Sequence, residues 1–315
     1  MERGTLIPLR LQVADVNLFI TCRDSVLLQG LDPVYQSFLG GAGRASGSID
    51  VEVRLELQSG PSTEGLREVF DSGASWSLFR DHGAQYLKWH PPAFEEPLWL
   101  ARFDDHQERV TVYCGDTLLS RRDGRTALSS PVRYPLDQLL LMYVLARKDG
   151  ALIHAAGAAI KGEGFVFPGR SGAGKTTLSR ELVARADVEP LSDDRIVVRR
   201  MDGQFRAFGT PWPGEADIAN NKSAPLSGIF FLAHGAKNVI SKIDKREALE
   251  RLLPVTSVPW YDRDVVPGLL TFLEGLVSAV PSFELQFRPG PDAADALLQF
   301  APNLLVSAGV GYAQV

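Results

Sequence analysis

Eight consecutive residues near the middle of the chain have the types and spacing of a phosphate-binding loop. Residues 169–176 match the pattern G-x-x-x-x-G-K-S/T at every required position. Glycines let backbone N–H groups turn inward around an anion, and a helix that follows adds its positive N-terminal end. Lys175 would reach the β- and γ-phosphates of a nucleotide, and the Thr176 hydroxyl would ligate Mg²⁺. The alternative is a glycine-rich turn that happens to precede a helix. The residues expected to contact the nucleotide are Gly169, Arg170, Ser171, Gly172, Ala173, Gly174, Lys175, Thr176 and Thr177.

Two further kinds of side chain could act on a bound phosphate. Asp193 follows Lys175 by 18 residues and is itself followed by Asp194. A kinase needs a carboxylate beside the transferred phosphoryl group, so one aspartate would accept the proton of the acceptor hydroxyl while the other helps to hold Mg²⁺. His154 lies in an apolar stretch before the loop. By residue type alone, the acidic pair also suits a turn, and His154 also suits a structural position in a core.

The elements that must position these residues are indicated by the hydrophobic pattern. Residues 164–168 form an apolar run typical of a strand, and residues 177–185 have the pattern of an amphipathic helix. Strand, loop and helix are the order that a phosphate-binding loop needs. Residues 152–160 predict a strand that turns back into the strand before the loop. Downstream, Asp202-Gly203 predicts a hairpin between two strands, and helices are predicted at 245–253, 267–277 and 292–300.

The first part of the chain has a different pattern. Residues 49–57 alternate between apolar and polar side chains, which predicts a half-buried strand. Residues 136–147 then predict a helix that is apolar nearly all round. We therefore expect a mainly antiparallel β domain over 1–134, a buried connecting helix over 135–149 and a second domain over 150–315. Further strands of the first domain are predicted at 75–79, 85–89, 98–103 and 109–114.

Three of these features, taken in order, resemble the HPr kinase/phosphorylase and phosphoenolpyruvate-carboxykinase-like P-loop kinases. They are His-Ala-Ala-Gly at 154–157, the loop at 169–176 and Ser-Asp-Asp at 192–194. The resemblance implies an α/β (α+β) fold whose C-terminal, carboxykinase-like P-loop domain has a mixed sheet. It also implies an ATP- and Mg²⁺-dependent kinase that phosphorylates a hydroxyl group, on a protein or peptide serine or on a small molecule.

The same resemblance implies a role for each matching residue. His154 assists the site, Asp193 is the general base, and Asp194 binds Mg²⁺ together with Thr176 and a later glutamate.

The later glutamate is sought in residues 209–215, Gly-Thr-Pro-Trp-Pro-Gly-Glu. This segment looks like the Gly-Thr-Pro-aromatic segment of HPr-kinase-related proteins, which makes Glu215 the expected metal ligand, with Asp217 as its competitor. A Pro/Gly-rich surface loop is the alternative interpretation. The chain departs from the bifunctional enzymes at Arg170, where they typically carry Asp.

Net charge, apolar runs and cysteine spacing exclude several classes of protein. The chain has 315 residues and a net charge of −5, which gives no basic footprint for nucleic acid or an anionic membrane. It has no signal-peptide core and no apolar run approaching the roughly 20 residues that span a bilayer, so a cytoplasmic protein is expected. Cys22 and Cys114 are far apart, without metal-ligand spacing, and are expected in the core.

Two other functions remain open from the sequence. One is a nucleotide-binding sensor or scaffold with little transfer activity, in which Arg170 marks altered chemistry. The other is a small-molecule kinase of the shikimate or nucleoside-monophosphate type, although such chains usually begin at the loop, whereas 168 residues precede it here. The related enzymes assemble into oligomers, which makes a homo-oligomer a further expectation.

Overall fold

The computed structural model describes residues 5–40, 49–81, 83–122, 124–288, 290 and 292–307. The chain divides into two compact units: unit 1 contains Met1–Val144 and Trp260–Asp262, and unit 2 contains Leu145–Pro259 and Arg263–Val315. The division falls inside helix α1 (Leu136–Arg147), which forms where the sequence predicts a helix. The predicted domain limits themselves stay predictions. No helix in the described part of the chain is long and apolar enough to cross a membrane.

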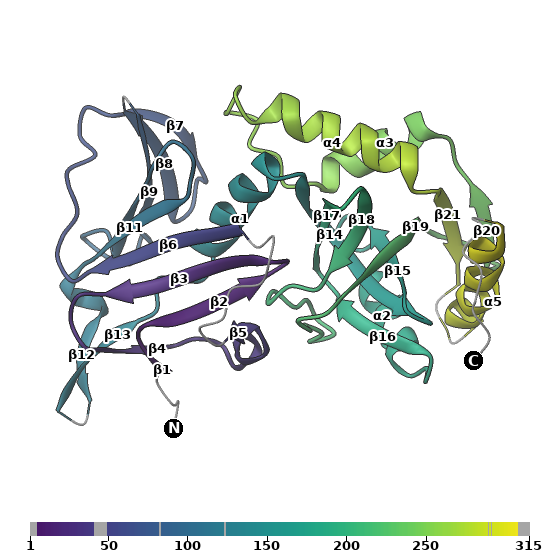
Figure 1. The fold of residues 1–315 in the computed structure, drawn as a ribbon, viewed down its shortest axis with the longest axis horizontal. Coiled ribbons are helices and arrows are strands. Elements are labelled where there is room, and N and C mark those ends of the chain that lie inside the picture. Colours follow the sequence, from purple (N-terminus) through teal and green to yellow (C-terminus); the bar gives the residue numbers. More distant parts are fainter. Residues whose placement is uncertain are drawn as a thin grey trace. The chain divides into compact units, whose positions relative to one another are not determined.

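Unit 1 is built on a large, mixed sheet (Figure 1). Most neighbouring strands are antiparallel, but β6 is parallel to both β3 and β11. Among the described residues, the strand order is β5 (Leu39–Gly40), β2 (Leu9–Val13), β3 (Val16–Cys22), β6 (Ile49–Glu56), β11 (Arg109–Cys114), β10 (Trp99–Phe103), β9 (Ala84–Trp89), β8 (Trp76–Asp81) and β7 (Arg67–Asp71).

A smaller sheet and two short 3-10 helices complete unit 1. The small sheet has the order β1 (Thr5–Leu6), β4 (Val26–Gln29), β13 (Arg125–Ser129) and β12 (Leu119–Arg122). The 3-10 helices are Pro33–Phe38 and Asp116–Leu118. The period-two pattern of β6 is confirmed, because Val51, Val53 and Leu55 are all buried.

Unit 2 is a mixed sheet with helices on both faces. In the described residues its strand order is β15 (Glu163–Pro168), β14 (Gly150–Ile160), β17 (Arg195–Met201), β18 (Gln204–Phe208), β19 (Ser223–His234), β21 (Ser282–Phe287) and β20 (Val239–Lys242). Strand β16 (Val188–Ser192) pairs with β14, and β15 also pairs in parallel with β19. The helices are α2 (Lys175–Val183), α3 (Lys245–Leu252), α4 (Val266–Ala279) and α5 (Asp292–Ser307), with a 3-10 turn at Leu253–Val255.

Alternate residues of the same strands belong to two separate hydrophobic cores, one on each face of the sheet. Val166 and Ile229 pack with the apolar faces of α3 and α4, whereas Phe167 and Phe230 pack with those of α2 and α5. Because both faces of the sheet are covered, β14, β15 and β19 are mainly apolar rather than alternating. This mixed α/β architecture, with large sheets, agrees with the expected α+β class. The covered sheet supports α2 and the strand ends around it through this packing.

Candidate functional site

The loop at 169–174 connects β15 to α2, in the predicted order of strand, loop and helix. Gly172 and Gly174 have φ values of +81° and +97°, which favour glycine over residues with a Cβ. A Cβ on Gly174 would also lie 2.5 Å from Cζ of Phe287. Helix α2 begins at Lys175, two residues earlier than its apolar pattern indicates, because Gly174 in the left-handed region serves as its N-cap.

The backbone of this loop offers hydrogen-bond donors without acceptors. Within the described residues, the N–H groups of Ser171, Gly172, Gly174 and Lys175 donate to no protein atom, whereas the N–H of Ala173 donates to the Arg170 carbonyl. The first turn of α2 contains no acidic residue, and no side chain caps it. Free N–H groups at the positive end of a helix suit an anion. These residues therefore fit a phosphate group.

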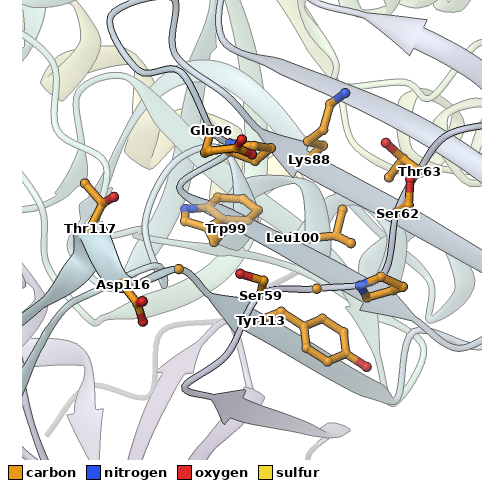
Figure 2. Close-up of a pocket in the computed structure, with 14 residues that line it drawn as sticks. Ser59, Ser62, Thr63, Lys88, Glu96, Trp99, Leu100, Tyr113, Asp116 and Thr117 are labelled. Carbon is orange, nitrogen blue, oxygen red and sulfur yellow. The ribbon is translucent and has the colours of Figure 1, made fainter.

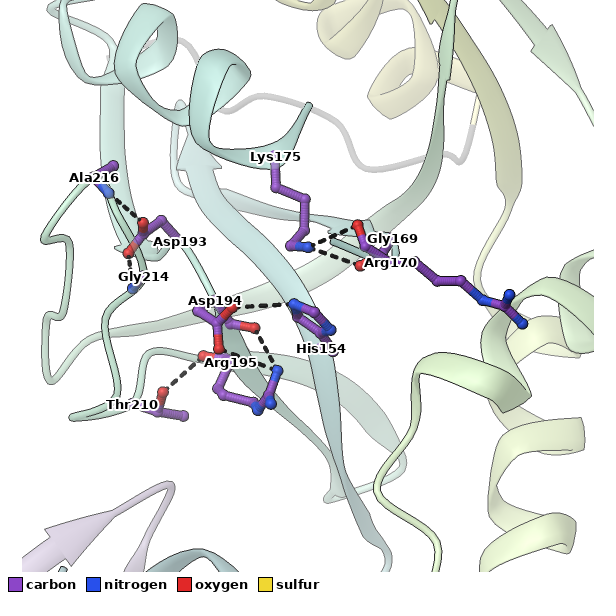
Figure 3. Close-up of polar contacts among 10 residues, drawn as sticks. All are labelled: His154, Gly169, Arg170, Lys175, Asp193, Asp194, Arg195, Thr210, Gly214 and Ala216. Carbon is purple, nitrogen blue, oxygen red and sulfur yellow. Dashed lines mark hydrogen bonds and ion pairs between the residues drawn. The ribbon is translucent and has the colours of Figure 1, made fainter. Parts of the chain in front are cut away.

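Lys175 lies across this loop. Its Nζ donates hydrogen bonds to the carbonyl oxygens of Gly169, at 2.8 Å, and of Arg170, at 3.2 Å. Burial lowers the pKa of Lys175; the charge of Asp194 opposes this shift and that of Arg195 adds to it. The Arg170 side chain is exposed and, in Figure 3, points away from Lys175. The ammonium group of Lys175 thus stays at the loop, and the guanidinium group of Arg170 is directed elsewhere.

Asp194 lies in the turn between β16 and β17 and contacts the side chains of His154 and Arg195 (Figure 3). Its Oδ1 is 3.0 Å from Nε2 of His154, and its Oδ2 is 3.1 Å from a guanidinium nitrogen of Arg195. His154 and Arg195 are partners in the antiparallel register of β14 and β17, which sets both side chains beside the turn. Burial would raise the pKa of Asp194, but the His154 hydrogen bond and the charges of Arg195 and Lys175 hold it below its usual range. Asp194 therefore stays ionised.

Asp193 has a different environment, although it is the adjacent residue. It is only 2% exposed, and its carboxylate accepts hydrogen bonds from the backbone N–H groups of Gly214, Ala216 and Ile218 at 2.8, 2.7 and 3.2 Å. These bonds hold the segment 214–218 against the turn. A carboxylate that is buried and already accepts three hydrogen bonds is poorly placed to take a proton from a substrate. The general-base role of Asp193 stays a prediction that this geometry does not favour.

The segment 209–222 forms a wall beside the acidic turn. Thr210 is fully buried and donates its hydroxyl to the Arg195 carbonyl at 2.7 Å, and Ser192 and Ala219 form an isolated β-bridge. Arg180 of α2 donates to the Glu215 carbonyl at 2.9 Å, which ties the helix after the loop to this segment. The turn, the helix and the segment are thus linked by hydrogen bonds within unit 2.

The expected metal ligands come from three separate elements. Thr176 is in the first turn of α2, Asp194 in the acidic turn, and Glu215 on the segment 209–222, where it is exposed, as is Asp217. In the described part of the chain, no three His, Cys, Asp or Glu side chains are grouped closely enough to hold a metal ion. Mg²⁺ usually takes only one or two carboxylates and completes its shell with phosphate oxygens and water. Asp194 and Thr176 stay the predicted ligands of an Mg²⁺ ion bound together with a nucleotide.

Sequence reasoning missed several residues that contact the loop or the turn. His234 and Phe287 are partners in the parallel register of β19 and β21. Nε2 of His234 lies 3.1 Å from the Gly172 carbonyl oxygen, and the Phe287 ring fills the space beside Gly174. Both are distant from the loop in sequence, so no local pattern indicates them. Arg195 could have been identified from the sequence as a partner of the acidic pair, because it directly follows the two aspartates.

Comparisons with known proteins give limited information. A family model described as SynChlorMet cassette protein ScmC matches residues 136–263, which is less than half of the chain but includes the loop and the acidic turn. The structure of the Hpr(Ser) kinase/phosphatase from Coxiella burnetii is 13% identical, with a TM-score of 0.32, and covers 50% of this chain and 92% of its own. This TM-score is too low to establish a shared fold. No curated protein matches the sequence.

Proposed function

We propose that the protein is an ATP- and Mg²⁺-dependent kinase that transfers the γ-phosphoryl group to a hydroxyl acceptor. The observation that carries the proposal is the loop before α2, whose unpartnered N–H groups are accompanied by Lys175. Phosphoryl transfer depends mainly on positioning and on stabilising negative charge, which such donors supply. The resemblance to HPr-kinase-like and carboxykinase-like P-loop kinases supports the same reaction, with a protein or peptide serine or a small-molecule hydroxyl as acceptor.

Lys175 and the loop would bind the nucleotide phosphates. To reach the β- and γ-phosphates, Lys175 would exchange its hydrogen bonds with the Gly169 and Arg170 carbonyls for bonds to phosphate oxygens. Mg²⁺ would neutralise charge on the phosphate oxygens. Thr176 and Asp194 are the residues that would hold it, because a carboxylate has about four lone-pair sites and Asp194 can keep His154 and Arg195 while contacting a cation.

His154 is the residue that would take the proton of the acceptor hydroxyl. Its Nε2 is held by Asp194, which orients the ring and leaves the other ring nitrogen available. Its side chain is 27% exposed, whereas Asp193 is 2% exposed. In this proposal Asp193 is a positioning residue, because it holds the segment that carries Glu215. The role of the base thus moves from the first aspartate to the histidine paired with the second.

The test is ADP formation by the purified protein with ATP and Mg²⁺, with and without a panel of serine-containing proteins, peptides and small hydroxyl compounds. A kinase gives ADP formation that rises with one class of acceptor, and phosphorylated product that equals the ADP formed. Lys175→Ala and Asp194→Asn should abolish the rise. If ATP is hydrolysed at the same low rate with every acceptor, the kinase proposal is wrong. If Asp194→Asn retains full transfer, the role given to Asp194 is wrong.

A nucleotide sensor is the second candidate, and one observation favours it. Nζ of Lys175 donates to two carbonyl groups of its own loop, so two of the three donors of its ammonium group are used without a substrate. A sensor would bind ATP and change its stability or its partners without producing ADP. ATP binding that raises the melting temperature, with no turnover on any acceptor, would favour this second function.

A further inference from the structure

A cavity on the large sheet of unit 1 is separate from the proposed nucleotide site (Figure 2). It has a volume of about 550 Å³, and every lining residue belongs to unit 1. Lys88, Leu100 and Tyr113 are direct partners across β9, β10 and β11, so their side chains form one row on the same face of the sheet. This row forms an apolar floor with one cationic end. A cavity of this size is within the range of small-molecule and peptide sites, roughly 300–1,000 Å³.

The segment 59–63 forms one wall and lies close to this floor. A Cβ on Gly60 would be 2.8 Å from Cδ2 of Leu100 and 3.2 Å from Cβ of Tyr113, so glycine allows the close approach. Within the described residues, the backbone N–H and C=O groups of Ser59, Gly60 and Ser62 form no hydrogen bonds. Pro61 lies between these residues and has no N–H, but the unpaired groups of its neighbours can pair with the main chain of an extended peptide, as the edge of a sheet does.

The charges of the cavity are unequal. Glu96 and Asp116 are exposed carboxylates, and neither forms an ion pair with another described residue. Lys88 is the one cationic lining residue, and its Nζ lies 4.7 Å from the centre of the Phe79 ring. Figure 2 shows Asp116 on the side of the cavity away from Ser62. Two free carboxylates against one ammonium group favour a ligand with a positive charge.

We propose that this cavity binds an extended peptide segment in which an apolar side chain and a Lys or Arg are two residues apart, so that both point to the same side of the peptide. The peptide main chain pairs with Ser59, Gly60 and Ser62. The apolar side chain packs on Leu100 and Tyr113, and the basic side chain contacts Glu96 and Asp116. This site does not depend on the proposed kinase activity, because no residue of the loop or of the acidic turn contributes to it.

The test uses the full-length protein and labelled, blocked hexapeptides, with binding measured by fluorescence anisotropy. The probe is Gly-Leu-Ser-Lys-Ser-Gly, and its matched partners replace Lys with Gln or Glu. The Lys peptide should bind at least about tenfold more tightly than the Glu peptide, and the preference should weaken as salt is added. Equal binding of the three peptides, or no binding by any of them, would overturn the proposal.

Substitutions of the lining carboxylates test whether the peptide binds in this cavity. Glu96→Gln with Asp116→Asn should reduce the preference for the Lys peptide about tenfold, since both contacts to the basic side chain are lost. Glu95→Gln removes an exposed carboxylate that does not line the cavity and should leave the preference unchanged. Because the three substituted residues are exposed, thermal unfolding should not change. A preference that survives the double substitution, or binding of a neutral oligosaccharide but of no peptide, contradicts the proposed ligand.

Discussion

Asp193 and Asp194 are adjacent and chemically identical, yet the structure gives them opposite environments. Asp193 turns into the protein, where three backbone N–H groups of the segment 214–218 surround its carboxylate. Asp194 turns toward His154 and Arg195, and its charge acts on Lys175 of the loop. Two adjacent aspartates can therefore have different roles, one structural and one chemical. The hydrogen-bond donors around each carboxylate, rather than the residue type, determine which aspartate has the structural role and which the chemical one.

The largest expected effect comes from Asp194→Asn. The substitution removes the negative charge that holds His154 and that would hold Mg²⁺, so phosphoryl transfer should fall about 10²–10⁴-fold. Stability should change little, because the carboxylate is 31% exposed and its ion pairs are screened by water. Steady-state ADP formation and urea unfolding measure the two properties. Unchanged transfer would remove the distinction between the two aspartates.

Asp193→Asn should have its main effect on stability. An amide replaces one accepting oxygen with a donor, so at least one backbone N–H of the segment 214–218 loses its acceptor. Buried bonds to a charged group contribute about 1.5–3 kcal/mol each, so the free energy of unfolding should fall by about 2–4 kcal/mol. Urea unfolding gives this value, and ATP affinity serves as the control. Loss of transfer at unchanged stability would instead restore Asp193 as the base.

Gly214→Ala tests the same contact from the opposite side. A Cβ at this position would lie 2.8 Å from Oδ2 of Asp193, so the segment must shift away from the turn. We expect the free energy of unfolding to fall by about 1–3 kcal/mol, as for overpacking elsewhere. Gly203→Ala is not a suitable control, because Gly203 has a φ of +80°. Gly275→Ala is suitable, since nothing lies near its added Cβ, and it should leave stability equal or slightly higher.

Arg180→Ala should have the smallest effect. It removes the bond from α2 to the Glu215 carbonyl, but the side chain is exposed, so the expected loss of stability is about 0–1 kcal/mol. The segment 209–222 should exchange its amide hydrogens faster, which hydrogen-exchange mass spectrometry can follow. Unchanged exchange in this segment would show that its other contacts, among them those of Asp193, Thr210 and Ala219, hold it without Arg180.

Local features of the fold were predictable from the sequence, because their causes lie within a few residues. The hairpin of β17 and β18 turns at Asp202-Gly203, where both residues have positive φ as this turn requires. Helix α3 begins after Asp244, whose side chain caps the Glu247 N–H. Helix α5 extends to Ser307, beyond the predicted end at Phe300, and therefore contains Pro302, a residue type that usually ends or kinks a helix.

The site was only partly predictable, because its contacts depend on register and on backbone atoms. His154 meets Asp194 through the pairing of β14 with β16 and β17, which no spacing along the chain reveals. The groups that hold Asp193 are backbone N–H groups, and every non-proline residue has one. The sequence therefore cannot show that this aspartate is committed to the segment 214–218. His234 reaches the loop only because β19 pairs in parallel with β15 and β21.

The proposed function requires that the loop before α2 binds the phosphates of a nucleotide. Equilibrium titration of ATP with Mg²⁺ tests it most directly, on the wild type, Lys175→Ala and the control Lys222→Ala. Lys222 is an exposed lysine of unit 2 that pairs with Glu189 rather than with the loop. We expect saturable binding of ATP that weakens at least about tenfold in Lys175→Ala and is unchanged in Lys222→Ala. Equal ATP affinity in all three proteins would contradict it.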